Sequence, residues 1–435
     1  MSDRLVVVLQ RVADGELLRV MCFLPPRHGK SELISRLFSA YYLYRYPEKW
    51  VGINSYAASL AYGFSRSARA NFRDMGGPLS EESRAVDNWE TTKKGGYWAA
   101  GVGGPITGKG FSLGIIDDPL KNAEEANSST IRDKQKDWYL STFYTRAEED
   151  AAIVIVQTRW HQDDLSGWLL ENEKEEPENW HIVSLEAIKT ESEPVIPDTC
   201  TLEPDWRKVG EPLNPVRLSL SRLKKICGKI GSYFWEALYQ QRPSPLEGGK
   251  IKRKWIQRYS EPPLFDYLVQ SWDTASKAKD LNCPWCCTTW GVKGAIAYLL
   301  DVHTHRYEYP DGKHQVQALA DKWQPLYVLI EDKSTGQSLL QEHRRDYDYR
   351  YNDVEIQPEG DKITRMVVES AAFEGGRAML PEKADWLADY EKLLFDFPAV
   401  AIMDPIDSTS QFLRWFRSKD DELSGAVDRI LALTG

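Results

Sequence analysis

The residues that most clearly indicate chemistry lie near the start of the chain, in Pro25-Pro26-Arg27-His28-Gly29-Lys30-Ser31. An apolar segment precedes this run and an amphipathic segment follows it, so a strand, a tight turn and a helix are expected in that order. In such a phosphate loop, backbone N–H groups and a lysine face the phosphates, and a serine hydroxyl ligates Mg²⁺. We therefore predict that Arg27, His28, Gly29, Lys30 and Ser31 bind ATP. The alternative is an ordinary helix start that Ser31 only caps.

Two aspartates end a second apolar segment, in Ile115-Ile116-Asp117-Asp118-Pro119. A carboxylate at such a strand end can hold Mg²⁺ through water, and its neighbour can polarise the water that attacks the γ-phosphate. We assign these two roles to Asp117 and Asp118. The alternative is that both aspartates only open a turn before Pro119.

A third apolar segment ends at Thr158. A polar residue at such a strand tip can sense the γ-phosphate, so Thr158 joins the predicted ATP site. Arg27 and Arg159 are candidates to neutralise the charge that develops on the phosphoryl group, and each is equally compatible with a scaffold ion pair. For Asp163 and Asp164, which follow closely, a helix cap is the favoured interpretation.

The second half of the chain carries acidic residues near the ends of apolar segments or the start of a helix: Asp273, Glu331, Asp332, Asp404 and Asp407. Carboxylates that converge from separate strands are costly unless a cation neutralises them. Two metal ions about 4 Å apart would do so, and would also activate water for phosphodiester cleavage. Carboxylate ligands favour Mg²⁺ or Mn²⁺ over zinc, so we predict a ribonuclease H-like metal nuclease. Each acid alone is equally a turn former or, at Asp404 and Asp407, part of a helix start.

The elements that must position these side chains follow two α/β patterns. Strands alternate with helices in the first half, which predicts a mostly parallel sheet covered by helices on both faces. A second α/β pattern begins near residue 260 and includes a hairpin around Lys293-Gly294. The expected strands are residues 17–24, 50–55, 112–117, 152–157, 267–272, 286–292, 296–302, 327–330 and 354–357. The expected helices of the second half are residues 316–323, 337–345 and 408–416.

Three regions follow from this pattern: a P-loop ATPase domain over residues 1–185, a linker or subdomain over 186–255, and a ribonuclease H-like nuclease domain over 256–435. The middle region is rich in Pro, Glu and Lys, and residues 240–249 read as an extended connector. The basic cluster at residues 250–254 is either a solvated face or a contact to a DNA backbone.

Composition narrows the class of protein. The chain has 435 residues, 42% of them hydrophobic, so it can bury ordinary cores in two or three domains. No apolar run approaches the roughly 18 residues that span a bilayer, and Met1-Ser2-Asp3-Arg4 does not resemble a secretory signal, so we expect an intracellular protein without a membrane partner. The formal net charge of −10 argues against a protein that coats DNA by charge alone.

The cysteines offer a weak metal signal. Cys283 and Cys286 have the spacing of a zinc half-site, but no second such pair follows them. Because a closed zinc site needs four ligands, we expect Cys286 and Cys287 to pack within a strand instead.

Taken in order, these motifs resemble the large terminase subunit of tailed bacteriophages and prophages, the motor that packages DNA into procapsids. The resemblance covers nearly the whole chain, and the ordered set is highly specific although no single string is. The matching segments of the first half are residues 25–33, 55–56, 60–61, 103–110, 116–119, 158–161 and 163–165. Those of the second half are residues 239–243, 271–275, 330–333 with Gly336, and 407–411.

The resemblance implies an N-terminal ATPase that translocates duplex DNA and a C-terminal ribonuclease H-like nuclease that cuts concatemers. It implies that Lys30 and Ser31 bind phosphate and Mg²⁺, and that Asp117 holds the metal. Asp118 takes the catalytic place that a glutamate usually fills, and Thr158 matches the motif that couples hydrolysis to motion. In the nuclease, the metal ligands of the family match Asp273, either Glu331 or Asp332, and Asp404.

The partners implied by the resemblance are double-stranded DNA, a small terminase subunit and the portal protein of the procapsid. A homo-oligomeric ring is implied during packaging, and a monomer in solution stays open. The expected location is the cytoplasm of a bacterial host, with transient docking on the portal.

The chain also departs from the family pattern. Leu24 stands in place of the first glycine of the phosphate loop, and Ile402-Met403-Asp404-Pro405 lacks a histidine and one acid that relatives often carry. Two other functions therefore stay open: a helicase-like, ATP-dependent repair nuclease, and an inactive prophage remnant that binds DNA. Strand unwinding without a procapsid would favour the first, and a lack of DNA-stimulated ATP hydrolysis would favour the second.

Overall fold

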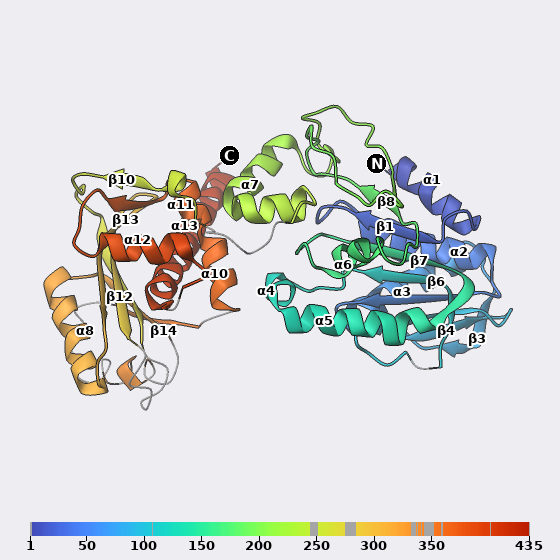
Figure 1. Cartoon of the computed structure of the whole chain (residues 1–435), viewed down its shortest axis with the longest axis horizontal. Coiled ribbons are helices and arrows are strands. Elements are labelled where there is room, and N and C mark those ends of the chain that lie inside the picture. Colours follow the sequence, from blue (N-terminus) through green and yellow to red (C-terminus); the bar gives the residue numbers. More distant parts are fainter. Residues whose placement is uncertain are drawn as a thin grey trace. The chain divides into compact units, whose positions relative to one another are not determined.

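The computed structural model of the chain has two compact units, Met1–Pro245 and Leu246–Gly435 (Figure 1). It describes residues 2–106, 108–243, 251–274, 284–331, 336, 338–340, 342, 352–357, 360–400 and 402–434. Residues 186–243 belong to the first unit. The predicted division of the chain after residues 185 and 255 stays a prediction. Among the described residues, no helix has the length and apolar composition needed to cross a membrane.

A nine-stranded sheet forms the centre of the first unit, in the order β3-β4-β5-β2-β6-β7-β1-β8-β9. Neighbouring strands are parallel along the run β5-β2-β6-β7-β1-β8-β9. β3 and β4 extend the sheet with antiparallel pairing at the β5 edge. The predicted mostly parallel sheet is therefore confirmed. The strands are β1 (Arg19–Phe23), β2 (Trp50–Ser55), β3 (Leu79–Arg84), β4 (Asn88–Thr91), β5 (Gly96–Gly101), β6 (Phe111–Asp117), β7 (Ala147–Gln157), β8 (His181–Ser184) and β9 (Thr201–Leu202).

Helices cover both faces of this sheet because the parallel strands are apolar on both sides. Val20 and Cys22 of β1 pack into one core cluster, whereas Met21 and Phe23 pack into the other. The first cluster is covered by α1 (Ser2–Ala13), the π-helical η1 (Glu32–Phe38), α2 (Ser39–Arg45) and α3 (Ala58–Asp74). The second is covered by α5 (Ser129–Trp138), η2 (Tyr139–Phe143) and α6 (Leu165–Asn172). Between β6 and β7 the chain also forms α4 (Ala123–Asn127) and η3 (Tyr144–Arg146).

The region after β9 folds back onto the chain that follows β8. It contains α7 (Leu220–Phe234), with a kink at Gly231, and η4 (Trp235–Tyr239). The amide of Gln240 makes two hydrogen bonds with the backbone of Ile188, and Gln241 Oε1 accepts a bond from the Arg159 N–H at 3.2 Å. The motif at residues 239–243 therefore ties this region to the end of β7.

The second unit is built on a seven-stranded mixed sheet, in the order β10-β16-β13-β12-β11-β14-β15. β11, β12 and β13 form an antiparallel meander, and the predicted hairpin at Lys293-Gly294 is confirmed. β14 lies parallel to β11, and β15 to β14. The strands are β10 (Gln257–Tyr259), β11 (Tyr267–Asp273), β12 (Trp285–Lys293), β13 (Ile296–His305), β14 (Tyr327–Glu331), β15 (Asn352–Ile356) and β16 (Ala378–Pro381).

Alternate residues of β11 face opposite sides of this sheet. Trp272 packs with Val316 of α8, while Ser271 exchanges hydrogen bonds with Ser408 at the start of α13, at 2.7 and 2.8 Å. Asp273 shares the face of Ser271, so the register of β11 directs it toward α13. The helices are η5 (Arg253–Trp255), α8 (Tyr309–Trp323), α10 (Lys362–Glu369), α11 (Ala371–Glu374), α12 (Leu387–Asp396) and α13 (Asp404–Thr434). The helix expected over 337–345 falls largely outside the described residues.

Candidate active sites

The predicted phosphate loop is a tight turn between β1 and the helix that contains η1 and α2. The φ angle is +88° at Gly29, a left-handed conformation that favours glycine, and +64° at Arg27. The Leu33 N–H donates to the Gly29 carbonyl at 3.1 Å, which starts the helical hydrogen bonding. The loop therefore places a helix N-terminus beside the carboxyl end of β1, an arrangement that binds phosphate groups.

Lys30 makes buried polar contacts with two neighbouring strand ends. Its Nζ donates to Thr158 Oγ1 and lies 2.9 Å from Asp118 Oδ2. The Thr158 N–H donates to Asp118 Oδ1 at 2.8 Å, and the Thr158 hydroxyl donates to the Leu24 carbonyl at 3.1 Å. Because β1, β6 and β7 are parallel, their carboxyl ends meet at one edge and bring these residues together.

Asp117 lies fully buried at the end of β6 and accepts hydrogen bonds from two serines at the start of the helix that follows the phosphate loop. Ser31 Oγ donates to its Oδ1 at 3.1 Å, and Ser35 Oγ donates to its Oδ2. Ser31 makes no capping hydrogen bond, so the capping alternative is wrong. Burial, and then the charge of Asp118, raises the pKa of Asp117 to about 7 against the opposing effect of Lys30.

Ser35 is a partner of Asp117 that was not predicted from the sequence. Its spacing of four residues from Ser31 was the available signal, because residues at that spacing share one face of a helix. The Ser35 hydroxyl holds the second carboxylate oxygen, so the orientation of Asp117 is set by two side chains rather than one.

A pocket of about 590 Å³ opens at the phosphate loop. Its lining includes residues that sequence analysis assigned to the ATP site: Arg27, Gly29, Lys30, Ser31, Asp118 and Thr158. It also includes residues that were not assigned, among them Arg36, Tyr56, Lys121, Trp160 and Arg217. Several cations thus converge on the pocket, which favours a polyphosphate ligand. Arg217 comes from the region before α7, where no motif marked it.

Asp117, His28 and Arg159 were candidates for the ATP site, but they do not line this pocket. The buried His28 ring directs Nδ1 to the Pro26 carbonyl at 2.9 Å, so its side chain packs behind the loop. Arg159 Nε donates to Asp164 Oδ2 at 2.8 Å in a buried ion pair. Arg159 is therefore a scaffold residue, and of the two arginines that the sequence suggested, Arg27 is the one that lines the pocket.

The aspartates after His161 have structural partners. Asp164 Oδ1 accepts a hydrogen bond from the Gly167 N–H at 3.0 Å, which confirms the predicted helix cap. Asp163 instead forms ion pairs with Arg132 at 3.0 Å and Lys136 at 2.8 Å. The cap prediction therefore holds for only one of the two residues.

A cluster of carboxylates, formed by Asp273, Glu331, Asp404 and Asp407, occurs in the second unit. Asp273 ends β11, Glu331 ends the neighbouring parallel strand β14, and Asp407 lies in the first turn of α13. Asp273, Glu331 and Asp407 line one small pocket of about 20 Å³, together with Ile356, Arg365, Ser410, Gln411 and Arg414. Asp404 does not line this pocket. Burial, together with the charges of Asp407 and Glu331, raises the pKa of Asp404, and the positive charge of Lys362 opposes this rise. Asp332 lies outside the described residues, so the choice between Glu331 and Asp332 stays open.

Two cations from α10 lie among these carboxylates. Lys362 Nζ pairs with Asp407 Oδ2 and lies 3.8 Å from Asp273 Oδ2. Arg365 Nη2 donates to Asp407 Oδ1 at 3.1 Å, and its Nη1 lies 4.0 Å from Glu331 Oε1. Neither cation was predicted from the sequence. Both lie more than 40 residues before Asp407, so no local pattern connects them to it.

The donor set fits a hard divalent ion. Asp273 is buried, and its Oδ2 accepts no hydrogen bond from any residue that the structure describes. Burial, followed by the charge of Asp407, raises the pKa of Asp273 well above its usual range, and Lys362 opposes the rise. Oxygen ligands of this kind suit Mg²⁺ or Mn²⁺. Asp332 lies outside the residues that the structure describes. Among the described residues, no group of three Asp, Glu, His or Cys side chains is close enough together to hold a metal ion.

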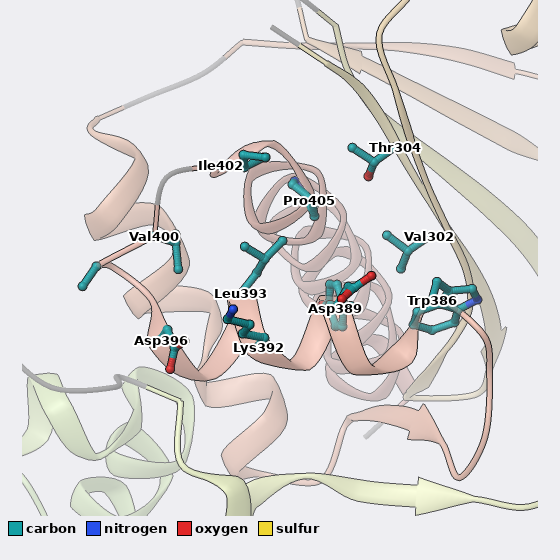
Figure 2. A pocket seen from close by; sticks show the side chains of 12 residues that line it. Val302, Thr304, Trp386, Asp389, Lys392, Leu393, Asp396, Val400, Ile402 and Pro405 are labelled. Atoms are coloured by element: carbon teal, nitrogen blue, oxygen red, sulfur yellow. The ribbon is translucent and has the colours of Figure 1, made fainter.

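A larger hollow of about 600 Å³ lies between β13, α12 and the start of α13. Figure 2 shows Trp386 and Leu393 beside Asp389, Lys392 and Asp396 at its wall. The predicted site residues do not line it. Its two carboxylates outnumber its single lysine, so it does not offer the positive charge that a DNA backbone requires.

The cysteines give no support to a zinc site. Cys286 and Cys287 are buried in β12, as predicted, and the Sγ of Cys286 accepts a hydrogen bond from Thr304 at 3.4 Å. Cys283 lies outside the described residues.

Two family models match the chain, one in each half. The model described as terminase large subunit, T4likevirus-type, N-terminal, matches residues 21–210, and the terminase RNaseH-like domain matches residues 270–413. The chain belongs to the large terminase subunits. This terminase therefore has an ATPase domain and a ribonuclease H-like nuclease domain, the predicted fold class, and it acts in DNA packaging.

Solved structures show the same fold. The large terminase of a thermophilic bacteriophage, in complex with ATP-γ-S, matches with a TM-score of 0.52 and 10% identity over 93% of this terminase and 97% of that chain. The same phage protein in complex with ADP gives a TM-score of 0.51 at 9% identity and equal coverage. No curated protein matches this terminase.

Proposed function

We propose that this terminase hydrolyses ATP in the pocket at the phosphate loop and cuts double-stranded DNA at the carboxylate cluster with bound divalent ions. The observation that carries the first part is the convergence of Lys30, Asp118 and Thr158 at neighbouring strand ends. The second part is carried by the burial of Asp273 beside Asp407 and Glu331 in one pocket.

In the ATP site, Lys30 leaves Asp118 to bind the outer phosphates, and Arg27 faces the charge that develops on the transferred group. Ser31 and Asp117 hold Mg²⁺, which neutralises phosphate charge when bound. Once Lys30 has moved, Asp118 is free to orient the attacking water. The fold shared with the phage terminase that binds ATP-γ-S supports ATP as the nucleotide.

Thr158 is the residue through which hydrolysis reaches the rest of the first unit. It contacts Lys30 directly, and its neighbour Arg159 is bonded through its N–H to Gln241 in the region after β9. Loss of the γ-phosphate contact at Thr158 would therefore shift a strand tip that is tied to that region. This chain of contacts is a physical route from hydrolysis to movement.

In the nuclease site, Asp273, Asp404, Asp407 and either Glu331 or Asp332 hold one or two Mg²⁺ or Mn²⁺ ions. Such ions activate water and stabilise the leaving oxygen of a phosphodiester. Asp407 is oriented by Arg365, and Asp273 by the register of β11, so the ligands are directed from separate elements before a metal binds.

The partners of this terminase follow from packaging. We propose a small terminase subunit, the portal protein of the procapsid and a homo-oligomeric ring on the portal, in the cytoplasm of a bacterial host. These finer assignments rest on membership of the family rather than on a contact of this chain.

The test is an assay of the purified full chain for phosphate release from ATP, with and without linear duplex DNA, and for nicking of a supercoiled plasmid with Mn²⁺. Both activities are expected, with ATP hydrolysis stimulated by DNA. A protein that binds DNA but shows neither activity would be the inactive prophage remnant. Unwinding of a duplex with no procapsid would instead favour the helicase-like repair nuclease.

A further inference from the structure

The two cations of α10, Lys362 and Arg365, differ in how exposed they are and in which carboxylates they contact. Arg365 has 13% of its side chain exposed and contacts both Asp407 and Glu331 through its rigid planar group. Lys362 has 42% of its side chain exposed and reaches the buried Asp407 and Asp273 with a single ammonium group. Arg365 thus lines the pocket, whereas Lys362 contacts two of the pocket's carboxylates through a side chain that is more exposed to solvent.

The position of Lys362 in its helix does not explain this contact. Lys362 follows the N-cap Asp361, whose carboxylate accepts a hydrogen bond from the Thr364 N–H at 2.9 Å. A positive charge in the first turn of a helix opposes the helix dipole. The ammonium is therefore held in place by Asp407 and Asp273 rather than by the helix.

A lysine between two buried carboxylates does the electrostatic work that a metal ion would do there. Without a cation, Asp273 and Asp407 would repel each other in a site from which water is largely excluded. An ammonium group on a flexible four-carbon stem can neutralise them and can also withdraw. The planar guanidinium of Arg365, with a hydrogen bond to Asp407 and an ion pair with Glu331 at 4.0 Å, does so less readily.

We propose that Lys362 is a built-in competitor of the divalent ion: its ammonium group holds Asp273 and Asp407 together in the metal-free protein and withdraws to solvent when a metal binds. Arg365 remains and keeps Asp407 oriented. This inference rests on the proposed nuclease function. It means that the metal-free site is stable but inactive, and that each metal-binding event must displace an internal cation.

The test compares Mn²⁺ binding to the full chain without nucleotide, by titration calorimetry, in the wild type and in Lys362→Met. The variant keeps the apolar stem and removes the charge, so Mn²⁺ affinity is expected to rise about tenfold, the scale at which neighbours of metal ligands act. Its melting temperature in EDTA is expected to fall by about 3 °C and to equal that of the wild type at saturating Mn²⁺. The matched control is Lys322→Met, because Lys322 pairs with Asp301 at 3.6 Å, outside the cluster.

Unchanged or weaker Mn²⁺ affinity in Lys362→Met would overturn the inference while leaving the nuclease function intact. The variant Asp273→Asn separates the two: if Mn²⁺ binding is unaffected by it, the cluster is not a metal site and both proposals fail. If the Lys362→Met variant does not fold, the same measurements are made on Lys362→Gln, which also removes the charge.

A second measurement uses the wild-type protein and needs no variant. Acylation of lysines, followed by peptide mass spectrometry, reports how accessible each ammonium group is. Labelling of Lys362 is expected to increase severalfold when Mn²⁺ is added, while labelling of Lys322 stays constant. Equal labelling of Lys362 with and without Mn²⁺ would show that the lysine does not withdraw.

Discussion

Lys30 and Asp118 form an ion pair, with 2.9 Å between Nζ and Oδ2, where the phosphate loop meets the carboxyl end of β6. The lysine that is assigned to phosphate and the acid that is assigned to the attacking water therefore contact each other directly. In the proposed mechanism, binding of the triphosphate separates Lys30 from Asp118 and frees Asp118 to orient the attacking water. We therefore propose that nucleotide binding and activation of Asp118 occur together.

Replacing Lys30 removes both its ion pair with Asp118 and the positive charge that is proposed to bind phosphate. We expect Lys30→Ala to reduce ATP turnover by about 100-fold or more, because a charge that stabilises the transferring phosphoryl group is lost. Mn²⁺-dependent plasmid nicking should persist, since the nuclease residues lie in the other unit. Phosphate-release and nicking assays on one preparation check both parts, with Lys49→Ala, which pairs with Asp150 at 3.3 Å, as control. Survival of ATP turnover would show that the loop is misassigned.

Replacing Asp273 tests the second site. Asp273→Asn keeps the shape of the side chain but removes a charged ligand, so nicking with Mn²⁺ is expected to fall by about 100-fold. DNA-stimulated ATP hydrolysis should be unaffected. Asp301→Asn on β13 is the control, because Asp301 pairs with Lys322 away from the cluster. Cutting that is retained in Asp273→Asn would mean that the carboxylates were misread.

His161 should make the stability of the first unit depend on pH. Its Nδ1 accepts a hydrogen bond from the Asp163 N–H at 3.0 Å, and burial, followed by the charge of Arg132, lowers its pKa to about 4. Because the folded state binds the proton less readily than the unfolded chain, this contribution to stability is complete above about pH 6.5 and is lost as the pH falls toward 4.

The measurement is the melting temperature between pH 4 and 7.5. The wild type should lose more stability on acidification than His161→Gln, which cannot titrate. The exposed His314, exchanged for Gln, should leave the wild-type slope unchanged. Equal slopes for the wild type and His161→Gln would contradict the assignment of a neutral, buried ring.

Gly52 tests the packing that supports the ATP site. A Cβ at this position in β2 would lie 2.1 Å from the Trp98 ring, and Trp98 is fixed by a hydrogen bond from its Nε1 to the Gly110 carbonyl at 2.9 Å. We expect Gly52→Ala to lower the free energy of unfolding by about 1–3 kcal/mol. In α3, a Cβ at Gly63 would meet open space, so Gly63→Ala should be neutral or stabilise by up to about 1 kcal/mol. Denaturant unfolding checks both, and equal midpoints would refute the clash.

Much of the fold could be predicted because its signals are local. The apolar runs that became β2, β6 and β11 were located to within a residue, since buried strands are continuous or alternating in hydrophobicity. The sequence did not predict β3, β4, β5, β8, β9, β10 and β16, among them the edge strand β3 and the inner strand β16. β3 is polar and β16 has four residues, so neither carries enough periodicity to be recognised.

The sequence by itself determined which residue types stand at the strand ends: Lys30 and Ser31 after β1, Asp117 and Asp118 at β6, and Asp273 at β11. Only the tertiary structure decided their partners. The positions of Lys362 beside Asp407 and of Arg217 at the phosphate loop depend on contacts between elements far apart in the chain. Such contacts leave no local pattern, because charged side chains are placed by the field and packing of the folded unit rather than by their neighbours in sequence.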